Sequence, residues 1–127
     1  MNILVLGTGT GVLPMFLRQH FSTHLNKITT VEIDAGVLLV GRDHFGFNAE
    51  HDPQIDSINA DAYEFVQSLD ANQFDMILID INDEAGGEGY NPPFKFFSPE
   101  TNHQLKATSF QSYRMAVNLI QAPVETP

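Results

Sequence analysis

The sequence predicts an α/β domain in which a parallel sheet lies between two layers of helices. Short β-branched or aliphatic runs alternate with segments of helical period through the first 81 residues, in the order β-α-β-α-β-α-β. One run, FDMILIDI at 74–81, is almost continuously apolar, which is typical of a strand covered on both faces. The length of 127 residues favours a single domain.

Capping residues mark where the helices begin. Asp34 precedes the second helix, which we expect to end near Gly46. Asp61 starts a capping-box pattern in front of a third helix, and Ser98 followed by Pro99 opens a fourth. The full set of expected elements is strands over 2–6, 27–33, 54–60, 74–81 and 113–120, and helices over 12–21, from 35 to near 46, over 62–69 and from 99 onward.

Composition excludes several classes of protein. A hydrophobic content of 43% with ten Phe is incompatible with a disordered chain, and no apolar run approaches the roughly 20 residues of a membrane span. The absence of Cys excludes disulfides and thiolate zinc sites and favours a cytoplasmic location. The His residues show no ligand spacing, so we expect no metal. A net charge of −10 argues against nucleic-acid binding and favours a cationic partner.

The glycine segment VLGTGTG at 5–11 is the first sign of a nucleotide site. A dinucleotide fingerprint has the spacing G-x-G-x-x-G. After Gly7 and Gly9 its third glycine would fall at position 12, which is Val12. The observed spacing is G-x-G-x-G, so the segment does not predict a pyrophosphate cradle.

Two carboxylates at predicted strand ends indicate a nucleoside instead. Glu32 ends the second strand, where its carboxylate can accept both ribose hydroxyls, and Asp61 follows the third strand, where it can read an adenine edge. Such an arrangement is typical of S-adenosylmethionine sites, which have no pyrophosphate to bind. Asp61 could also be only a helix cap, and we leave both interpretations open.

Four motifs extend this pattern to most of the chain. The chain resembles class I S-adenosylmethionine-dependent methyltransferases. It carries their motifs in the same order and spacing, as VLGTGTG, VEID, NADAYEFV and FDMILIDI. The chain looks most like the spermidine-synthase-like branch of this class. Within that branch it resembles the C-terminal domain of elongation factor 1-alpha lysine and N-terminal methyltransferases, in the segments GVLPMFLRQHF, VEIDAGVLLVGRDHFGF and PPFKFFSPE. The resemblance implies a Rossmann-like sheet of strand order 3-2-1-4-5, a domain over 1–120 and a tail over 121–127.

The resemblance also implies S-adenosylmethionine as the cofactor and a role for seven residues. These are Gly7, Gly9 and Gly11 along the methionine portion, Glu32 at the ribose, Asp61 and Ala62 at the adenine, and Asp80 facing the methyl donor and the acceptor amine. Ligands in open α/β sheets lie outside these strand ends. The implied substrate is a basic protein or another amine, with elongation factor 1-alpha as the protein that the resemblance suggests.

A second transfer chemistry remains open on the same scaffold. Spermidine synthases move an aminopropyl group, and the acids Asp80 and Asp83 echo their paired acidic strand end. Those enzymes carry an Asp inside the glycine loop, however, where this chain has the uncharged Thr10. Methyl transfer is therefore the favoured interpretation. The Gly- and Pro-rich segment at 82–97 is long enough to be an active-site loop.

The end of the chain bears on whether transfer takes place at all. A full class I domain has two more strands after the fifth, and we expect these strands 6 and 7 to be lacking. The chain could then be an incomplete or inactive fragment, or a non-catalytic remnant that binds a nucleoside. An open edge at the fifth strand would also invite self-association.

Overall fold

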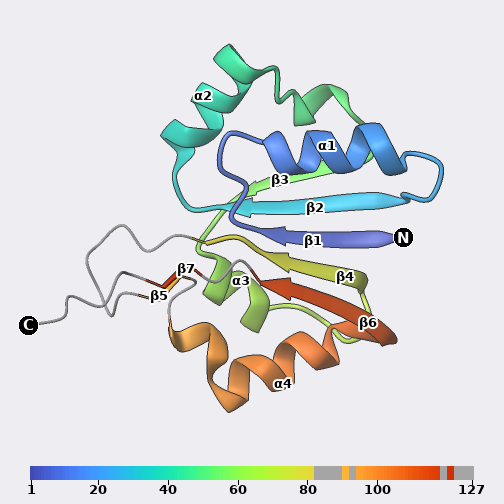
Figure 1. Cartoon of the computed structure of the whole chain (residues 1–127), viewed down its shortest axis with the longest axis vertical. Helices are drawn as coiled ribbons and strands as arrows, with labels where there is room; N and C mark the ends of the chain where they lie inside the picture. The colour runs from blue at the N-terminus through green and yellow to red at the C-terminus, as the bar shows by residue number, and fades with distance from the viewer. Residues whose placement is uncertain (82–89, 92–93, 118–119, 122–127) are drawn as a thin grey trace, which may run out of the picture.

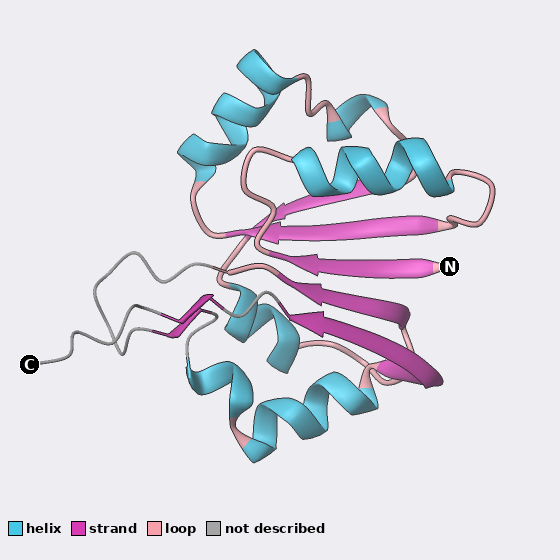
Figure 2. Ribbon diagram, viewed as in Figure 1, coloured by secondary structure: helices cyan, strands magenta, loops and turns pink. Residues whose placement is uncertain are grey.

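A twisted parallel sheet with helices on both faces forms the protein (Figures 1 and 2). The computed structural model describes residues 1–81, 90–91, 94–117 and 120–121. Five strands pair in the order β3-β2-β1-β4-β6, which is 3-2-1-4-5 when the strands of this sheet are counted along the chain, as predicted. The elements are β1 (Asn2–Leu6), α1 (Val12–Phe21), β2 (Lys27–Glu32), α2 (Ala35–Phe45), η1 (Ala49–His51), β3 (Ile55–Asn59), α3 (Ala62–Gln67), β4 (Phe74–Ile79), β5 (Tyr90–Asn91), η2 (Phe94–Phe97), α4 (Pro99–Ala107), β6 (Ser109–Val117) and β7 (Ile120–Gln121).

Alternating side chains of the strands build one core on each face of the sheet. In β1, Ile3 and Val5 point to the face covered by α1 and α2, whereas Leu4 and Leu6 point to the face covered by α3 and α4. All four side chains are at most 1% exposed. Because both faces of this central strand are buried, its sequence is a continuous apolar run, as expected for a parallel sheet.

The helix boundaries follow the capping residues that the sequence shows. The Asp34 carboxylate accepts hydrogen bonds from the N–H groups of Gly36 and Val37, at 2.7 and 3.4 Å, where α2 begins. The helix ends at Gly46, whose φ of 77° is in the left-handed region. Ser98 caps α4 by accepting from Thr101 N at 3.2 Å. These predicted starts and the predicted stop are confirmed.

The last strand of the sheet differs from its predicted position. We expected it over 113–120, but β6 begins at Ser109 directly after α4 and ends at Val117. The carbonyl of Thr108 accepts from the N–H groups of Gln73 and Phe74, which joins the end of α4 to the start of β4 and sets where β6 begins to pair. Beyond this strand, β7 pairs antiparallel with β5, which the sequence pattern does not predict.

The described residues contain no helix that is long and apolar enough to span a membrane. Most of the predicted loop at 82–97 lies outside the described residues, including Asp83.

Candidate functional site at the carboxyl edge of the sheet

The residues that the sequence analysis selects meet at one edge of the sheet. All pairs in the five-stranded sheet are parallel, so the carboxyl ends of its strands lie on the same side, where the arrowheads point in Figure 1. The glycine loop follows β1, Glu32 ends β2, Asp61 precedes α3 after β3, and Asp80 follows β4. Ligands of open α/β sheets bind outside this edge.

The three glycines of the loop all have positive φ, but their surroundings differ. Gly7 packs so closely against the backbone carbonyl of Asp80 that a Cβ would collide with it, and a Cβ on Gly11 would collide with the Phe47 ring. Gly9 is different, because a Cβ placed there would meet no atom of the described residues within 4 Å. Within the part of the chain that the structure describes, the space beside Gly9 is therefore open, and a ligand has room to approach the loop there.

The carboxylate of Glu32 connects the ends of two strands. Its Oε2 accepts a hydrogen bond from Gly9 N at 2.9 Å, and its Oε1 accepts one from Asp34 N at 3.0 Å. A carboxylate has about four acceptor sites, so each oxygen keeps one for a further donor. Glu32 thus shapes the glycine loop and offers two acceptor positions at the sheet edge.

Asp61 is a helix cap, as one of its two interpretations requires. Its Oδ1 accepts from the N–H groups of Tyr63 and Glu64, at 2.7 and 3.1 Å. Its Oδ2 lies 3.7 Å from Lys95 Nζ. Ala62 is the first residue of α3 and packs on the core cluster between α3 and the sheet, and an N–H at that position has no acceptor within its own helix. Both cap hydrogen bonds use Oδ1, and Oδ2 is the oxygen beside Lys95.

Asp80 lies beside the glycine loop at the end of β4. Its N–H donates to the carbonyl of Leu6 at 2.8 Å, which continues the pairing of β4 with β1. Its carbonyl packs against Gly7, and the residue is exposed at the sheet edge. The chain therefore brings Asp80 and the glycine loop into direct contact through their backbones.

Two residues at this edge were missed by sequence reasoning. Ile33, between Glu32 and Asp34, is 66% exposed, although an apolar residue at the end of a buried strand is expected to be covered. The sequence feature that could have identified Ile33 is its position inside the motif VEID, directly after the candidate ligand Glu32. Lys95 was missed because no local sequence pattern places it beside Asp61.

The chain matches the spermine/spermidine synthase domain over residues 1–106. It belongs to the spermine/spermidine synthase domain family.

Relatives of this family member include both methyltransferases and an aminopropyltransferase. The mouse eEF1A lysine and N-terminal methyltransferase is 30% identical over 124 residues, which are 94% of this chain and 17% of the relative. The polyamine aminopropyltransferase of Hydrogenobaculum sp. is 31% identical over 87 residues, which are 67% of this chain and 30% of the relative. The chain thus spans less than a third of the length of either protein.

A solved structure resembles the whole described fold. The crystal structure of human methyltransferase-like protein 13 in complex with SAH superposes with a TM-score of 0.87 at 26% identity, over 98% of this chain and 56% of that chain. The spermidine synthase of Thermotoga maritima shares the fold with a TM-score of 0.62 at 23% identity, over 85% of this chain and 34% of that chain. The Rossmann-like fold expected from the sequence is confirmed.

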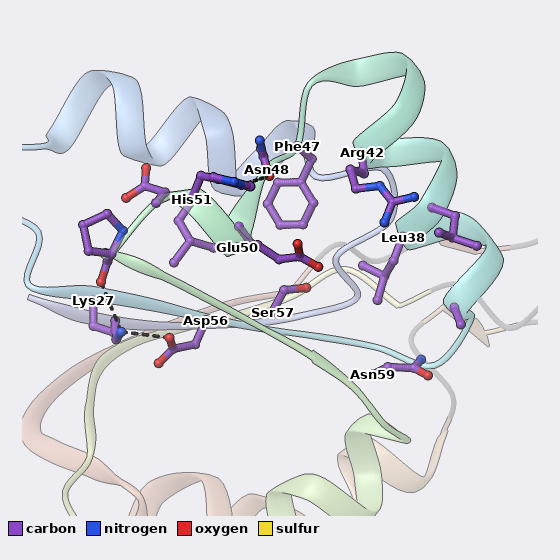
Figure 3. Close-up of a pocket in the computed structure, with 16 residues that line it drawn as sticks. Lys27, Leu38, Arg42, Phe47, Asn48, Glu50, His51, Asp56, Ser57 and Asn59 are labelled. Atoms are coloured by element: carbon purple, nitrogen blue, oxygen red, sulfur yellow. Dashed lines mark hydrogen bonds and ion pairs between the residues drawn. The ribbon is translucent and has the colours of Figure 1, made fainter.

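This family member also has a hollow whose wall includes Phe47, the residue that packs against Gly11 of the glycine loop. It encloses about 840 Å³ between α2, η1 and β3, and its walls include Leu38, Arg42 and Phe47 (Figure 3). A hydrogen bond from Arg42 lowers the pKa of the Asp43 carboxyl, and the same contact raises the pKa of Arg42. None of the predicted site residues lines this hollow.

Proposed function

We propose that this protein binds S-adenosylmethionine at the carboxyl edge of its sheet and transfers the methyl group to an amine nitrogen. The binding unit is the domain over 1–120, followed by a tail over 121–127. The observation that carries the proposal is the Glu32 carboxylate, which holds the loop at Gly9 and keeps acceptor sites for two ribose hydroxyls.

The geometry of the edge fits such a cofactor. The open space at Gly9 accepts the methionine portion, with Gly7 and Gly11 shaping the loop on either side. Ile33 presents an exposed apolar surface next to Glu32, suited to one face of the base. At the far side, Asp61 Oδ2 is an acceptor for the exocyclic amine of adenine, and the N–H of Ala62 is a donor for a ring nitrogen.

The chain's own contribution to transfer is positioning. The cofactor supplies a sulfonium methyl group, which needs little covalent help from a protein but needs an amine in line with it. We assign Asp80 to the amine, because it follows β4 beside the glycine loop. Its carboxylate accepts a hydrogen bond from the amine and directs the nitrogen lone pair towards the methyl group.

The surface charge favours a cationic acceptor. Sixteen acidic residues against six basic residues attract a lysine-rich protein segment or a small amine. A mouse relative acts on eEF1A according to its name, and we extend a protein amine of that kind to this chain as its acceptor class. The cytoplasm, where such an acceptor is made, is the proposed location.

Aminopropyl transfer is the second candidate, and the family match favours it. The residue that argues against it is Thr10, because an uncharged side chain in the glycine loop cannot pair with the free ammonium of a decarboxylated donor. Both candidates use the same nucleoside site, so the donor that binds separates them.

The test is calorimetric titration of the purified chain with S-adenosylhomocysteine, decarboxylated S-adenosylmethionine and NAD. We expect binding of S-adenosylhomocysteine and none of NAD. A preference for the decarboxylated donor would replace methyl transfer with aminopropyl transfer. A folded chain that binds none of the three would be a remnant without cofactor function. Transfer of a labelled methyl group to elongation factor 1-alpha or to putrescine then identifies the acceptor.

Self-association through the last strand of the sheet stays a prediction. Within the described residues β6 pairs with β4 along one side and ends the strand order of the sheet. A free edge of this kind offers unpaired backbone groups to another chain. Light scattering across a range of protein concentrations measures whether a dimer forms.

A further inference from the structure

Lys95 lies against the first turn of α3 although it belongs to a different part of the chain. Its Nζ is 3.7 Å from Asp61 Oδ2, 4.9 Å from the centroid of the Tyr63 ring and 5.9 Å from the centroid of the Phe96 ring. One carboxylate oxygen and two aromatic faces therefore surround the ammonium on its inner side. Distances below about 6 Å between a cation and a ring are attractive.

The backbone of Lys95 is fixed by its neighbours. Phe96 is 3% exposed and packs edge-on against Tyr63, with ring centroids 6.0 Å apart. The hydroxyl of Thr101 in α4 donates to the Lys95 carbonyl at 3.0 Å. With its carbonyl and the following residue anchored, Lys95 starts its side chain from a defined place beside α3.

The ammonium faces the oxygen of Asp61 that the helix cap does not use. Oδ1 already accepts from Tyr63 and Glu64, so Oδ2 is the atom that a base would contact under the proposed function. Lys95 and the exocyclic amine of adenine are then two donors for the same oxygen. A carboxylate oxygen accepts both only when their directions allow it.

We propose that Lys95 sets how strictly this site selects a 6-aminopurine over a 6-oxopurine. This inference rests on the proposed function. A carboxylate alone only accepts hydrogen bonds, so it favours an exocyclic amine and repels a carbonyl oxygen. The ammonium beside it only donates, so it competes with the amine for Oδ2 and offers a partner to a carbonyl. Lys95 thus weakens binding of the adenine cofactor and reduces the difference in affinity between that cofactor and its oxo analogue.

The size of the effect follows from the exposure of the pair. Lys95 and Asp61 side chains are 47% and 32% exposed, and ion pairs of this kind are worth little in water. We therefore expect Lys95→Met to strengthen S-adenosylhomocysteine binding by about two- to fivefold and to weaken S-inosylhomocysteine binding by a similar factor. Raising the salt concentration should move the wild-type affinity for S-adenosylhomocysteine towards that of the variant, because salt screens the competing pair.

The experiment is calorimetric titration of the full chain with these two ligands. Lys106→Met removes the same charge from an exposed position in the last turn of α4 and serves as the matched control. Lys95→Arg keeps a cation at the site and should retain the wild-type preference between the two ligands. Thermal unfolding of each variant verifies that the fold is intact.

The outcomes separate this inference from the proposed function. If wild type binds S-adenosylhomocysteine and Lys95→Met leaves the preference between the ligands unchanged, the role of Lys95 is wrong and the cofactor site stands. Weaker binding of S-adenosylhomocysteine by Lys95→Met also overturns the inference, since Lys95 would then support the base. If neither protein binds either ligand, the proposed cofactor site itself is wrong, and the role of Lys95 is rejected with it.

Discussion

The carboxylate of Glu32 accepts a hydrogen bond from Gly9 N at 2.9 Å, so the end of β2 holds the loop that follows β1. The second oxygen of the same carboxylate holds Asp34 N at 3.0 Å, where the next helix is capped. One side chain therefore organises both segments that border the open space at the sheet edge. Its loss should affect ligand binding more than global stability, because Glu32 lies at the rim of the fold and not in its core.

Replacing Glu32 with Ala should lower the affinity for S-adenosylhomocysteine by at least about tenfold, since hydrogen bonds to a charged group are worth about 1.5–3 kcal/mol each. Titration calorimetry measures the change. Glu100→Ala, which removes an exposed carboxylate from the first turn of α4, is the control and should leave affinity unchanged. Equal affinities of Glu32→Ala and wild type would remove Glu32 from the cofactor site.

Alanine at two loop glycines should separate folding from binding. Gly7 has a φ of 91° and no room for a Cβ beside the Asp80 carbonyl, so Gly7→Ala should destabilise the fold by about 1–3 kcal/mol or more. Gly9 has a φ of 54° and open space, so Gly9→Ala should cost only about 1–2 kcal/mol.

Of these two variants, Gly9→Ala should lose more affinity for the cofactor although it loses less stability. The methyl group of Gly9→Ala enters the space assigned to the cofactor, and the folded variant should bind S-adenosylhomocysteine measurably more weakly. Urea unfolding and calorimetry on both variants provide the two readouts. A Gly9→Ala protein with wild-type affinity would mean that the ligand does not approach the loop there.

Two substitutions of Asp61 should distinguish its cap from its proposed contact with the base. Asp61→Ala removes the oxygen that accepts from Tyr63 and Glu64 and should cost about 1 kcal/mol of stability. Asp61→Asn retains an oxygen for the cap, because Asn is as good an N-cap as Asp. Its affinity for S-adenosylhomocysteine should nevertheless fall, since the negative charge that attracts the exocyclic amine is gone.

The contrary result for Asp61 is as informative. If Asp61→Asn binds S-adenosylhomocysteine like wild type and Asp61→Ala is merely less stable in thermal unfolding, then Asp61 is a structural cap alone. The base would then be recognised by other groups at the edge.

Thr30 offers a stabilising substitution in the core. It lies in β2 with 0% exposure, and its hydroxyl has no hydrogen-bond partner in the part of the chain that the structure describes. Thr30→Val replaces that hydroxyl with a methyl group of similar size and should raise the free energy of unfolding by about 1 kcal/mol. Urea unfolding with an unchanged m value would measure this directly.

A second buried threonine provides the matched control. Thr101 is also 0% exposed, but its hydroxyl donates to the Lys95 carbonyl at 3.0 Å. Thr101→Val should therefore destabilise the protein, because it removes the 3.0 Å hydrogen bond and leaves that carbonyl with the longer one from Ser98 N, at 3.4 Å. Equal effects of the two substitutions would show that the hydroxyl of Thr30 is satisfied after all.

Much of the fold could be predicted because its signals are local. The cap at Asp34 and the stop at Gly46 depend on residues within one turn, and both are where the sequence indicates. The alternation of elements predicts a parallel sheet, whereas its strand order was implied by the resemblance to class I methyltransferases and is confirmed. The start of β6 was missed by several residues, because Ser109 begins to pair where Thr108 meets β4 and not where an apolar run begins.

By itself, the sequence determined the alternating strands and helices through β4 and which acids follow those strands, because periodicity and capping chemistry act over a few residues. The tertiary structure decided what each of those acids faces. It turned Glu32 towards Gly9 and brought Lys95 to the oxygen of Asp61 that the cap does not use. Such contacts join segments far apart in the chain, so their geometry is set by the packing of the sheet and helices and by no local pattern.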